Sequence, residues 1–256
     1  MKFPAVFIGH GSPMLALENN MKTLTLKKMG DYILKTYGKP KAILMVSAHW
    51  YQNDTFVSCA KEPKQINDMY GFPDELYALK YPVKGDPELA EKVVKMLPGI
   101  ARVNNDWGID HGVWTPLIHM FPKADIPIVE MSVNARLDAK GSYLVGQVLG
   151  DLREQGYLVM GSGNVVHNLR ETDWNNPHGS KQADAFDTYI HDAITRKDYD
   201  AVIDYKSHPD SSYAVPTPDH FLPLLYVLGA AGQDDVKVFN YFRELGSMSQ
   251  TCYLFE

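Results

Sequence analysis

Short apolar runs alternate with longer amphipathic segments along this chain. The apolar runs are rich in Val, Ile and Phe, and they predict β-strands over 4–8, 41–48, 55–59, 127–132, 157–161 and 236–241, with a last strand through 251–255. Apolar positions recur at helical spacing over 22–37, 86–97, 113–121, 138–155, 181–196 and 218–231. Several strands are almost continuously apolar, which is typical of strands covered on both faces. The alternation predicts an α/β fold whose mostly parallel or mixed central sheet has helices on both faces.

No segment rich in Gly, Ser or Pro divides the 256 residues, and no internal repeat is visible, so we expect one domain over 1–256. Two long stretches, 60–85 and 168–180, lack regular periodicity and are rich in Pro, Asn, Asp and Tyr. Loops of that length often carry function.

The charge and cysteine content narrows the classes of partner. A net charge of −6 without a basic tract argues against binding to nucleic acid or to an anionic membrane. No apolar stretch approaches the roughly 18 residues that a membrane span needs. The two cysteines, Cys59 and Cys252, make no disulfide framework, and the N-terminus lacks a signal peptide, so we expect a reducing, cytoplasmic location.

Three of the nine histidines follow predicted strands. His10 ends the first strand in a Gly-His-Gly sequence, His49 ends the second, and His167 follows the strand over 157–161. In open α/β sheets the carboxyl ends of the strands form the ligand crevice, and neutral imidazole is a common metal ligand. We therefore expect these histidines to converge, with the glycines beside His10 allowing a ligand to approach the backbone.

Two further histidines lie in distinctive settings. His111 stands in an Asp-His-Gly turn between Trp107 and Trp114, a stretch that can form the wall of a pocket for a planar substrate. The sequence around Thr217 and Pro218 predicts a helix N-terminus that would place His220 in the first turn.

Each of these readings has a plainer alternative. A single strand-end histidine is often an exposed polar residue, the two tryptophans suit core packing, and His220 suits a solvated helix start. His119, His178 and His191 have no setting that suggests chemistry, and His208 is intermediate because it precedes Pro209 in a loop. Phosphate-binding loops and nucleophile elbows have no matching motif in the chain. The residues alone therefore indicate a multi-histidine metal site in an α/β fold.

Five motifs in order carry a more specific signal: Gly9-His10-Gly11-Ser12-Pro13, Ser47-Ala48-His49-Trp50, Asp110-His111-Gly112, Gly161-Ser162-Gly163-Asn164-Val165-Val166-His167-Asn168 and Thr217-Pro218-Asp219-His220. With them the chain resembles the DOPA-type extradiol ring-opening dioxygenases, a branch of the class III, LigB-like enzymes. The resemblance extends from residue 7 to the Gly246-Ser247-Met248-Ser249 segment.

The resemblance implies roles for individual residues. His10, His49 and His220 would hold one divalent metal ion, and His167 would be a fourth ligand or an acid–base group. His111 would act as an acid–base group facing the substrate. We expect three further residues near the substrate: Ser12, Trp107 and His208.

The resemblance also implies a reaction and a metal. A catechol such as DOPA would be cleaved with O2 to a muconic semialdehyde, and Fe(II) would be needed for activity, although Zn(II) is expected in the protein as isolated. His220 stands where extradiol enzymes commonly have a carboxylate ligand. A zinc-dependent hydrolase on the same histidines and a Memo-like binding protein are the alternatives. The oligomeric state is left open by the sequence.

Overall fold

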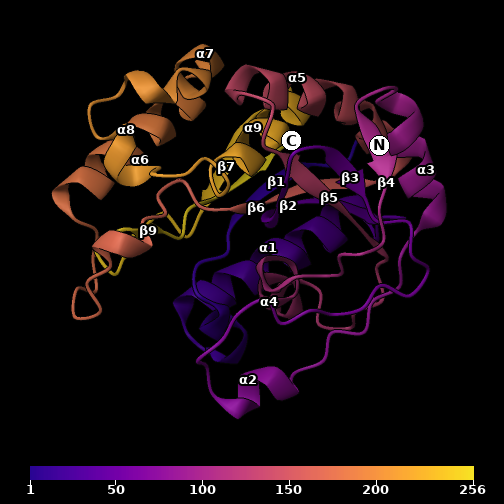
Figure 1. Ribbon diagram of the computed structural model, residues 1–256, viewed down its shortest axis with the longest axis horizontal. Coiled ribbons are helices and arrows are strands. Elements are labelled where there is room, and N and C mark those ends of the chain that lie inside the picture. Colours follow the sequence, from indigo (N-terminus) through magenta and orange to yellow (C-terminus); the bar gives the residue numbers. More distant parts are fainter.

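Eight strands form one mixed sheet at the centre of the molecule (Figure 1). The computed structural model describes residues 1–256, and the strand order across the sheet is β4-β3-β5-β2-β6-β1-β10-β7. The strands are β1 (Ala5–Gly9), β2 (Ile43–Gln52), β3 (Thr55–Val57), β4 (Ala101–Val103), β5 (Ile128–Asn134), β6 (Leu158–Gly163), β7 (Val236–Phe239) and β10 (Cys252–Phe255). A separate two-stranded sheet pairs β8 (Arg243–Glu244) with β9 (Met248–Ser249).

The four central strands are parallel. β6 pairs in parallel with β1 on one side and β2 on the other, and β2 pairs in parallel with β5. β3 and β4 are parallel to each other, whereas β3 is antiparallel to β5, and β10 is antiparallel to both β1 and β7. The carboxyl ends of β1, β2, β5 and β6 therefore meet at the same edge of the sheet.

Helices cover both faces of the sheet, as the alternation of the sequence predicts (Figure 1). They are α1 (Met21–Tyr37), α2 (Asp74–Ala78), α3 (Pro87–Met96), α4 (His111–Met120), α5 (Ala139–Leu149), α6 (Lys181–Thr195), α7 (Tyr199–Ile203), α8 (Ser211–Ala214) and α9 (Leu222–Ala231). Four 3-10 helices complete the set: η1 (Pro13–Leu17), η2 (Gly150–Gln155), η3 (Leu169–Glu171) and η4 (Tyr205–Ser207).

The two core layers follow from the side-chain alternation of the strands. Along β1, Ala5 and Phe7 belong to a cluster of 42 buried residues that includes α3, α5, α6 and α9. Val6 and Ile8 belong to a second cluster of 24 buried residues that includes α1 and α4. Successive residues of a strand point to opposite faces, so a continuously apolar strand is buried by both layers.

Several predicted boundaries were wrong. β2 continues past 48 to Gln52, with an irregular register against β5 between Ser47 and Tyr51, so His49 lies inside the strand. The helix predicted over 218–231 begins only at Leu222, and Thr217 does not cap it. The segment 138–155 is α5 followed by η2, and α4 begins at His111 rather than at 113. The short elements α2, β4, β8 and β9 carry too few residues for a periodic signal.

None of the helices has the length and apolar character needed to cross a membrane.

Candidate metal centre

Histidines from separate parts of the chain gather at the carboxyl edge of the parallel strands. His10 directly follows β1, and His49 lies near the end of β2. His220 lies in the turn before α9, and its ring centroid is 5.3 Å from that of His10 and 5.0 Å from that of His49. Because this edge is common to β1, β2 and β6, the fold brings together residues more than 200 positions apart.

The tautomer of His10 is fixed by its neighbours. Ser162 on β6 donates its hydroxyl hydrogen to the carbonyl oxygen of Gly112, so its oxygen is left to accept. The Nδ1 atom of His10 lies 2.8 Å from that oxygen and must therefore carry the hydrogen. The lone pair of His10 is then on Nε2.

Two carboxylates fix the other rings in the same way. The Nδ1 of His49 donates to Asp68 over 3.1 Å, and the Nδ1 of His220 donates to Asp219. A carboxylate accepts hydrogen bonds and has none to give, so each of these rings also keeps its lone pair on Nε2. Carboxylates that hold the outer nitrogen of a histidine are the usual support of a metal-binding imidazole.

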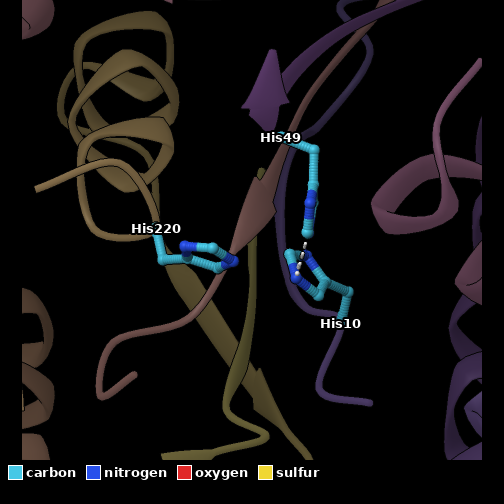
Figure 2. A group of neighbouring side chains, drawn as sticks. All are labelled: His10, His49 and His220. Atoms are coloured by element: carbon cyan, nitrogen blue, oxygen red, sulfur yellow. Dashed lines mark hydrogen bonds between the residues drawn. The ribbon is translucent and has the colours of Figure 1, made fainter. Parts of the chain in front are cut away.

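The three Nε2 atoms converge (Figure 2). The rings of His10 and His49 point at each other with their Nε2 atoms 3.2 Å apart, and the ring of His220 faces them from the turn before α9. The Nε2 of His220 is buried and has no hydrogen-bond partner. Three convergent nitrogen lone pairs without donors are the donor set of a divalent transition metal. The residues present therefore fit the metal that the resemblance implies.

Burial favours the neutral form of two of the three rings. Burial, followed by the charge that His49 would carry, lowers the pKa of His10 well below its usual value. Burial also lowers the pKa of His220, although Asp219 opposes the shift. For His49, burial lowers the pKa, but the hydrogen bond to Asp68 and the charges of the nearby carboxylates outweigh it and raise the pKa overall. The buried His10 and His220 are thus held neutral, the form that binds metals.

His111 lies next to the set formed by His10, His49 and His220, and its ring contacts the carboxylate of Asp68, as the ring of His49 does. Its ring centroid is 3.9 Å from that of His49, and its Nδ1 lies 3.0 Å from Asp68. Asp68 also accepts the backbone N–H of His111 over 2.8 Å, at the first residue of α4. His49, Asp68 and His111 form a second group with metal-binding geometry. The Nδ1–H of His49 already donates to Asp68, however, so this group supports the first set rather than forming a separate centre.

His167 lies flat against His220. The two ring centroids are 3.6 Å apart and the planes differ by 3°. Burial, then the charge that His220 would carry, lowers the pKa of His167 to about 2. The imidazole of His167 is therefore neutral next to the set, and its backbone N–H is held by the carbonyl oxygen of Ala214.

The glycines of the first motif have a different role from the one we expected. A Cβ on Gly9 would lie 2.7 Å from the backbone carbon of Gln250, and one on Gly11 would lie 2.3 Å from the side chain of Gln250. The chain itself, not a ligand, occupies the space beside these glycines. Gly11 also has a φ of +61°, which favours glycine.

Gly112 is the glycine that meets the histidines. A Cβ at this position would lie 2.8 Å from Cδ2 of His49 and 3.2 Å from Nδ1 of His10. The absence of a side chain at Gly112 lets the first turn of α4 press against both rings. The Asp-His-Gly motif thus supplies His111 and clears the space for two other histidines.

A buried pair of carboxyl groups lies behind the site. Asp110 and Glu130 are both inaccessible to solvent, and the backbone N–H of Asp110 donates to Glu130 over 3.4 Å. Burial, followed by the charge of Asp110, raises the pKa of Glu130 well above its usual value. Burial and the charge of Asp110 thus favour the protonated form of Glu130, which avoids a second buried charge.

The three residues expected near the substrate lie in different surroundings. Ser12 caps η1, where its oxygen accepts the N–H of Met14. Trp107 donates to Asp110 over 3.2 Å and stacks on Trp50.

His208 packs on α6. Its ring contacts those of Phe186 and Tyr189, and no aromatic contact or hydrogen bond joins it to the histidine set. Its expected contact with substrate stays a prediction, as do those of Ser12 and Trp107.

Sequence reasoning missed the residues that orient the histidines. Asp68 lies in the stretch 60–85 without any motif around it, and Ser162 and Asp219 were present only as neighbours of histidines. Asp219 directly precedes His220, which is the one signal that pointed to a supporting carboxylate. Asp68, by contrast, reaches His49 and His111 only because of the path that its loop takes in the fold, and no local motif indicates that path.

Comparison with known proteins assigns the chain to a family. The chain belongs to the LigB family: residues 4–256 match the catalytic LigB subunit of aromatic ring-opening dioxygenase. It is an extradiol aromatic ring-opening dioxygenase, and the resemblance seen in the motifs is confirmed.

Individual relatives cover nearly the whole chain. It is 40% identical to the 4,5-DOPA dioxygenase extradiol of Escherichia coli (strain K12), over 97% of this chain and 93% of that protein. It is 37% identical to the protein of the same name from Beta vulgaris, over 97% and 95%. The crystal structure of an uncharacterised Escherichia coli K12 protein matches with a TM-score of 0.86 at 35% identity and covers 100% of both chains.

Proposed function

We propose that this dioxygenase opens the ring of a catechol of the DOPA type with O2, giving a muconic semialdehyde, and that His10, His49 and His220 bind its catalytic Fe(II) through Nε2. The convergence of three Nε2 lone pairs, two of them on buried rings and one on the half-buried ring of His49, carries the proposal. The relatives named 4,5-DOPA dioxygenase extradiol support the choice of substrate class.

Fe(II), when bound, would supply the redox change that lets O2 react with a catechol, which Zn(II) lacks. Three neutral imidazoles add no negative charge to the ion, in contrast to the common set of two histidines and a carboxylate. The negative charges that would offset the ion are on Asp68 and Asp219, which contact the Nδ1 atoms of the ligand histidines rather than the ion itself. His49 and His220 transmit them through their Nδ1–H groups.

In this proposal His111 takes a proton from a substrate hydroxyl. Its ring lies beside that of His49, and an imidazolium formed there would face the carboxylate of Asp68 at 3.0 Å. Asp68 is well suited to this role, because its hydrogen bonds and ion pairs with His111 and His49 overcome burial and hold its pKa below the usual range. His111 is thus the acid–base group of the proposal.

His167 keeps the two roles that the motifs imply. Stacked on His220 and neutral, it either adds a fourth nitrogen to the metal or hydrogen-bonds to the substrate oxygen and hands on a proton. Replacing it with glutamine separates the two roles, because an amide can hydrogen-bond but is a poor ligand and cannot act as a base. Retained metal affinity with slow turnover would assign His167 to proton transfer.

The test starts from metal-free protein reloaded anaerobically with Fe(II), and then supplies L-DOPA or simpler catechols with oxygen. We expect one O2 consumed per catechol and a yellow product, and we expect none from the zinc-loaded protein. The control is His178→Ala, a change at an exposed histidine whose side chain forms no hydrogen bond or ion pair and whose backbone hydrogen bonds the change leaves in place. Absence of oxygen uptake across the catechols, together with ester or amide cleavage by the zinc form, would contradict the proposal in favour of a hydrolase.

A further inference from the structure

A cavity of about 270 Å³ lies at the carboxyl ends of β2 and β5, next to the turn that carries His220. Its walls include Tyr51 from β2, Arg136 and Asp138 from the loop between β5 and α5, and Tyr205 and Lys206 from η4. Pro218 and Leu222 also line it.

The cavity adjoins the metal centre through two short connections. Pro218 and Leu222 stand two residues to either side of His220, and Tyr51 is two residues beyond His49. Two residues span at most about 7 Å of extended chain. The lining of the cavity is therefore joined to His49 and to His220 by short stretches of chain.

The polar groups of the cavity favour an anion. Arg136 and Lys206 take part in no ion pair, and the ammonium group of Lys206 lies 5.9 Å from the ring centroid of Tyr205. The phenol hydroxyls of Tyr51 and Tyr205 have no hydrogen-bond partner in the protein, although Tyr205 is only 3% exposed. Two cations and two free hydroxyls at one cavity suit a carboxylate, which accepts several hydrogen bonds and pairs with guanidinium.

The one acidic residue of the cavity is already engaged. Asp138 is the N-cap of α5 and accepts the backbone N–H of Gly141 over 2.7 Å. The partial positive charge at the N-terminus of α5 offsets its carboxylate. The free charge that a ligand meets is thus positive.

We propose that this cavity binds the side-chain carboxylate of the catechol substrate and so selects acidic catechols over uncharged ones. The inference rests on the proposed function, because it assumes that the catechol ring lies at the histidine set. Arg136 makes the direct contact, Lys206 adds charge, and the two tyrosines donate hydrogen bonds.

The first test compares substrates in the iron-loaded enzyme. We compare kcat/KM for 3,4-dihydroxyphenylpropionate, which has a carboxylate, with kcat/KM for 4-methylcatechol, which has none. We expect Arg136→Gln to lower the ratio of the first to the second by roughly tenfold to a hundredfold, because a hydrogen bond to a charged group usually contributes about that much to binding. The matched control is Arg196→Gln, at an exposed arginine that ends α6 and forms no ion pair. An unchanged ratio in Arg136→Gln, or an equal fall in the control, would overturn the assignment.

The second test needs no turnover. Calorimetry measures the binding of 3-phenylpropionate, which has the carboxylate but no catechol hydroxyls, to the zinc-loaded protein. We expect its Kd to rise about tenfold or more in Arg136→Gln and in Lys206→Gln, but not in Arg196→Gln. If no catechol is consumed while this binding pattern holds, the proposed function fails and the cavity assignment survives. If the wild type does not bind 3-phenylpropionate, or Arg136→Gln binds it equally well, the cavity assignment fails.

Discussion

The Nε2 atoms of His10 and His49 lie 3.2 Å apart, and each belongs to a ring whose Nδ1 already donates a hydrogen bond. Two neutral rings in this arrangement direct lone pairs at each other, which is unfavourable unless a cation or a proton lies between them. The framework of the protein imposes this arrangement through Ser162 and Asp68. A bound metal ion would remove the repulsion between the two lone pairs.

Removing one ring of the set should therefore remove the metal. We expect His49→Ala to bind Zn(II) or Co(II) at least a hundredfold more weakly than wild type, because two nitrogens replace three and the ion loses its tie to Asp68. Metal content after dialysis and a Co(II) titration measure the effect. His178→Ala should retain wild-type affinity, and a His49→Ala protein that keeps its metal would rule out this ligand set.

His111 should behave differently from His49. Its proposed task is proton transfer, so we expect His111→Ala to keep Zn(II) affinity within a few-fold of wild type while kcat for catechols falls by roughly 100-fold or more, the usual size of acid–base catalysis. The pair of measurements is metal affinity and oxygen uptake on the same preparation. Loss of the metal in His111→Ala would show that the division of roles between these two histidines is wrong.

Asp68→Asn should weaken the centre without removing a ligand. The amide still accepts one hydrogen bond but carries no charge to offset the ion or an imidazolium at His111. We expect metal affinity to fall about 10- to 100-fold, as is usual for the loss of a carboxylate that supports a metal-binding histidine. The control is Asp192→Asn, on the exposed side of α6. Equal effects of the two changes on the Co(II) titration would assign no special role to Asp68.

Gly112→Ala tests whether the histidines need the space in front of α4. The added Cβ would lie 2.8 Å from the ring of His49, so that ring must shift away from the set. We expect metal affinity to drop about tenfold or more, while thermal stability of the metal-free protein changes little because alanine favours the helix by about 1 kcal/mol. Gly141→Ala, in the first turn of α5, is the control, since a Cβ there meets only the side chains of Leu137 and Asp138.

Asp187 predicts the pH dependence of stability. Burial raises its pKa from 3.8 to about 6, against the opposing effects of Arg243 and two hydroxyl groups. The folded protein therefore holds a proton that the unfolded chain releases between these values, so this residue's contribution to stability falls as pH rises from about 4 to 6. A shift of this size corresponds to about 3 kcal/mol.

Urea unfolding of the metal-free protein at a series of pH values measures this slope. Asp187→Asn cannot titrate, so we expect the variant to lose about 3 kcal/mol less than wild type across that pH range. Asp192→Asn should keep the wild-type slope. Parallel curves for wild type and Asp187→Asn would contradict the raised pKa.

The predictability of the site differs from residue to residue. His10 and His167 were found because each follows an apolar strand, and the carboxyl ends of parallel strands share one edge. The resemblance assigned His220 to the metal set, but the sequence predicted it in the first turn of a helix that in fact begins two residues later. Asp68 was not found at all, because a long loop without periodicity gives no sign of where its side chains end.

The sequence by itself determined the α/β class, the two buried faces of the sheet and the histidines that gather at its edge. These depend on local alternation and on short motifs, both of which are written in consecutive residues. Only the tertiary structure decided which nitrogen of each ring is free, because Ser162, Asp68 and Asp219 act across the fold or through a particular turn. Tertiary packing also decided that Gln250 lies against Gly9 and Gly11, while Gly112 makes room for the rings. Ring orientation and the filling of space are properties of contacts between distant segments, and one segment's pattern does not contain them.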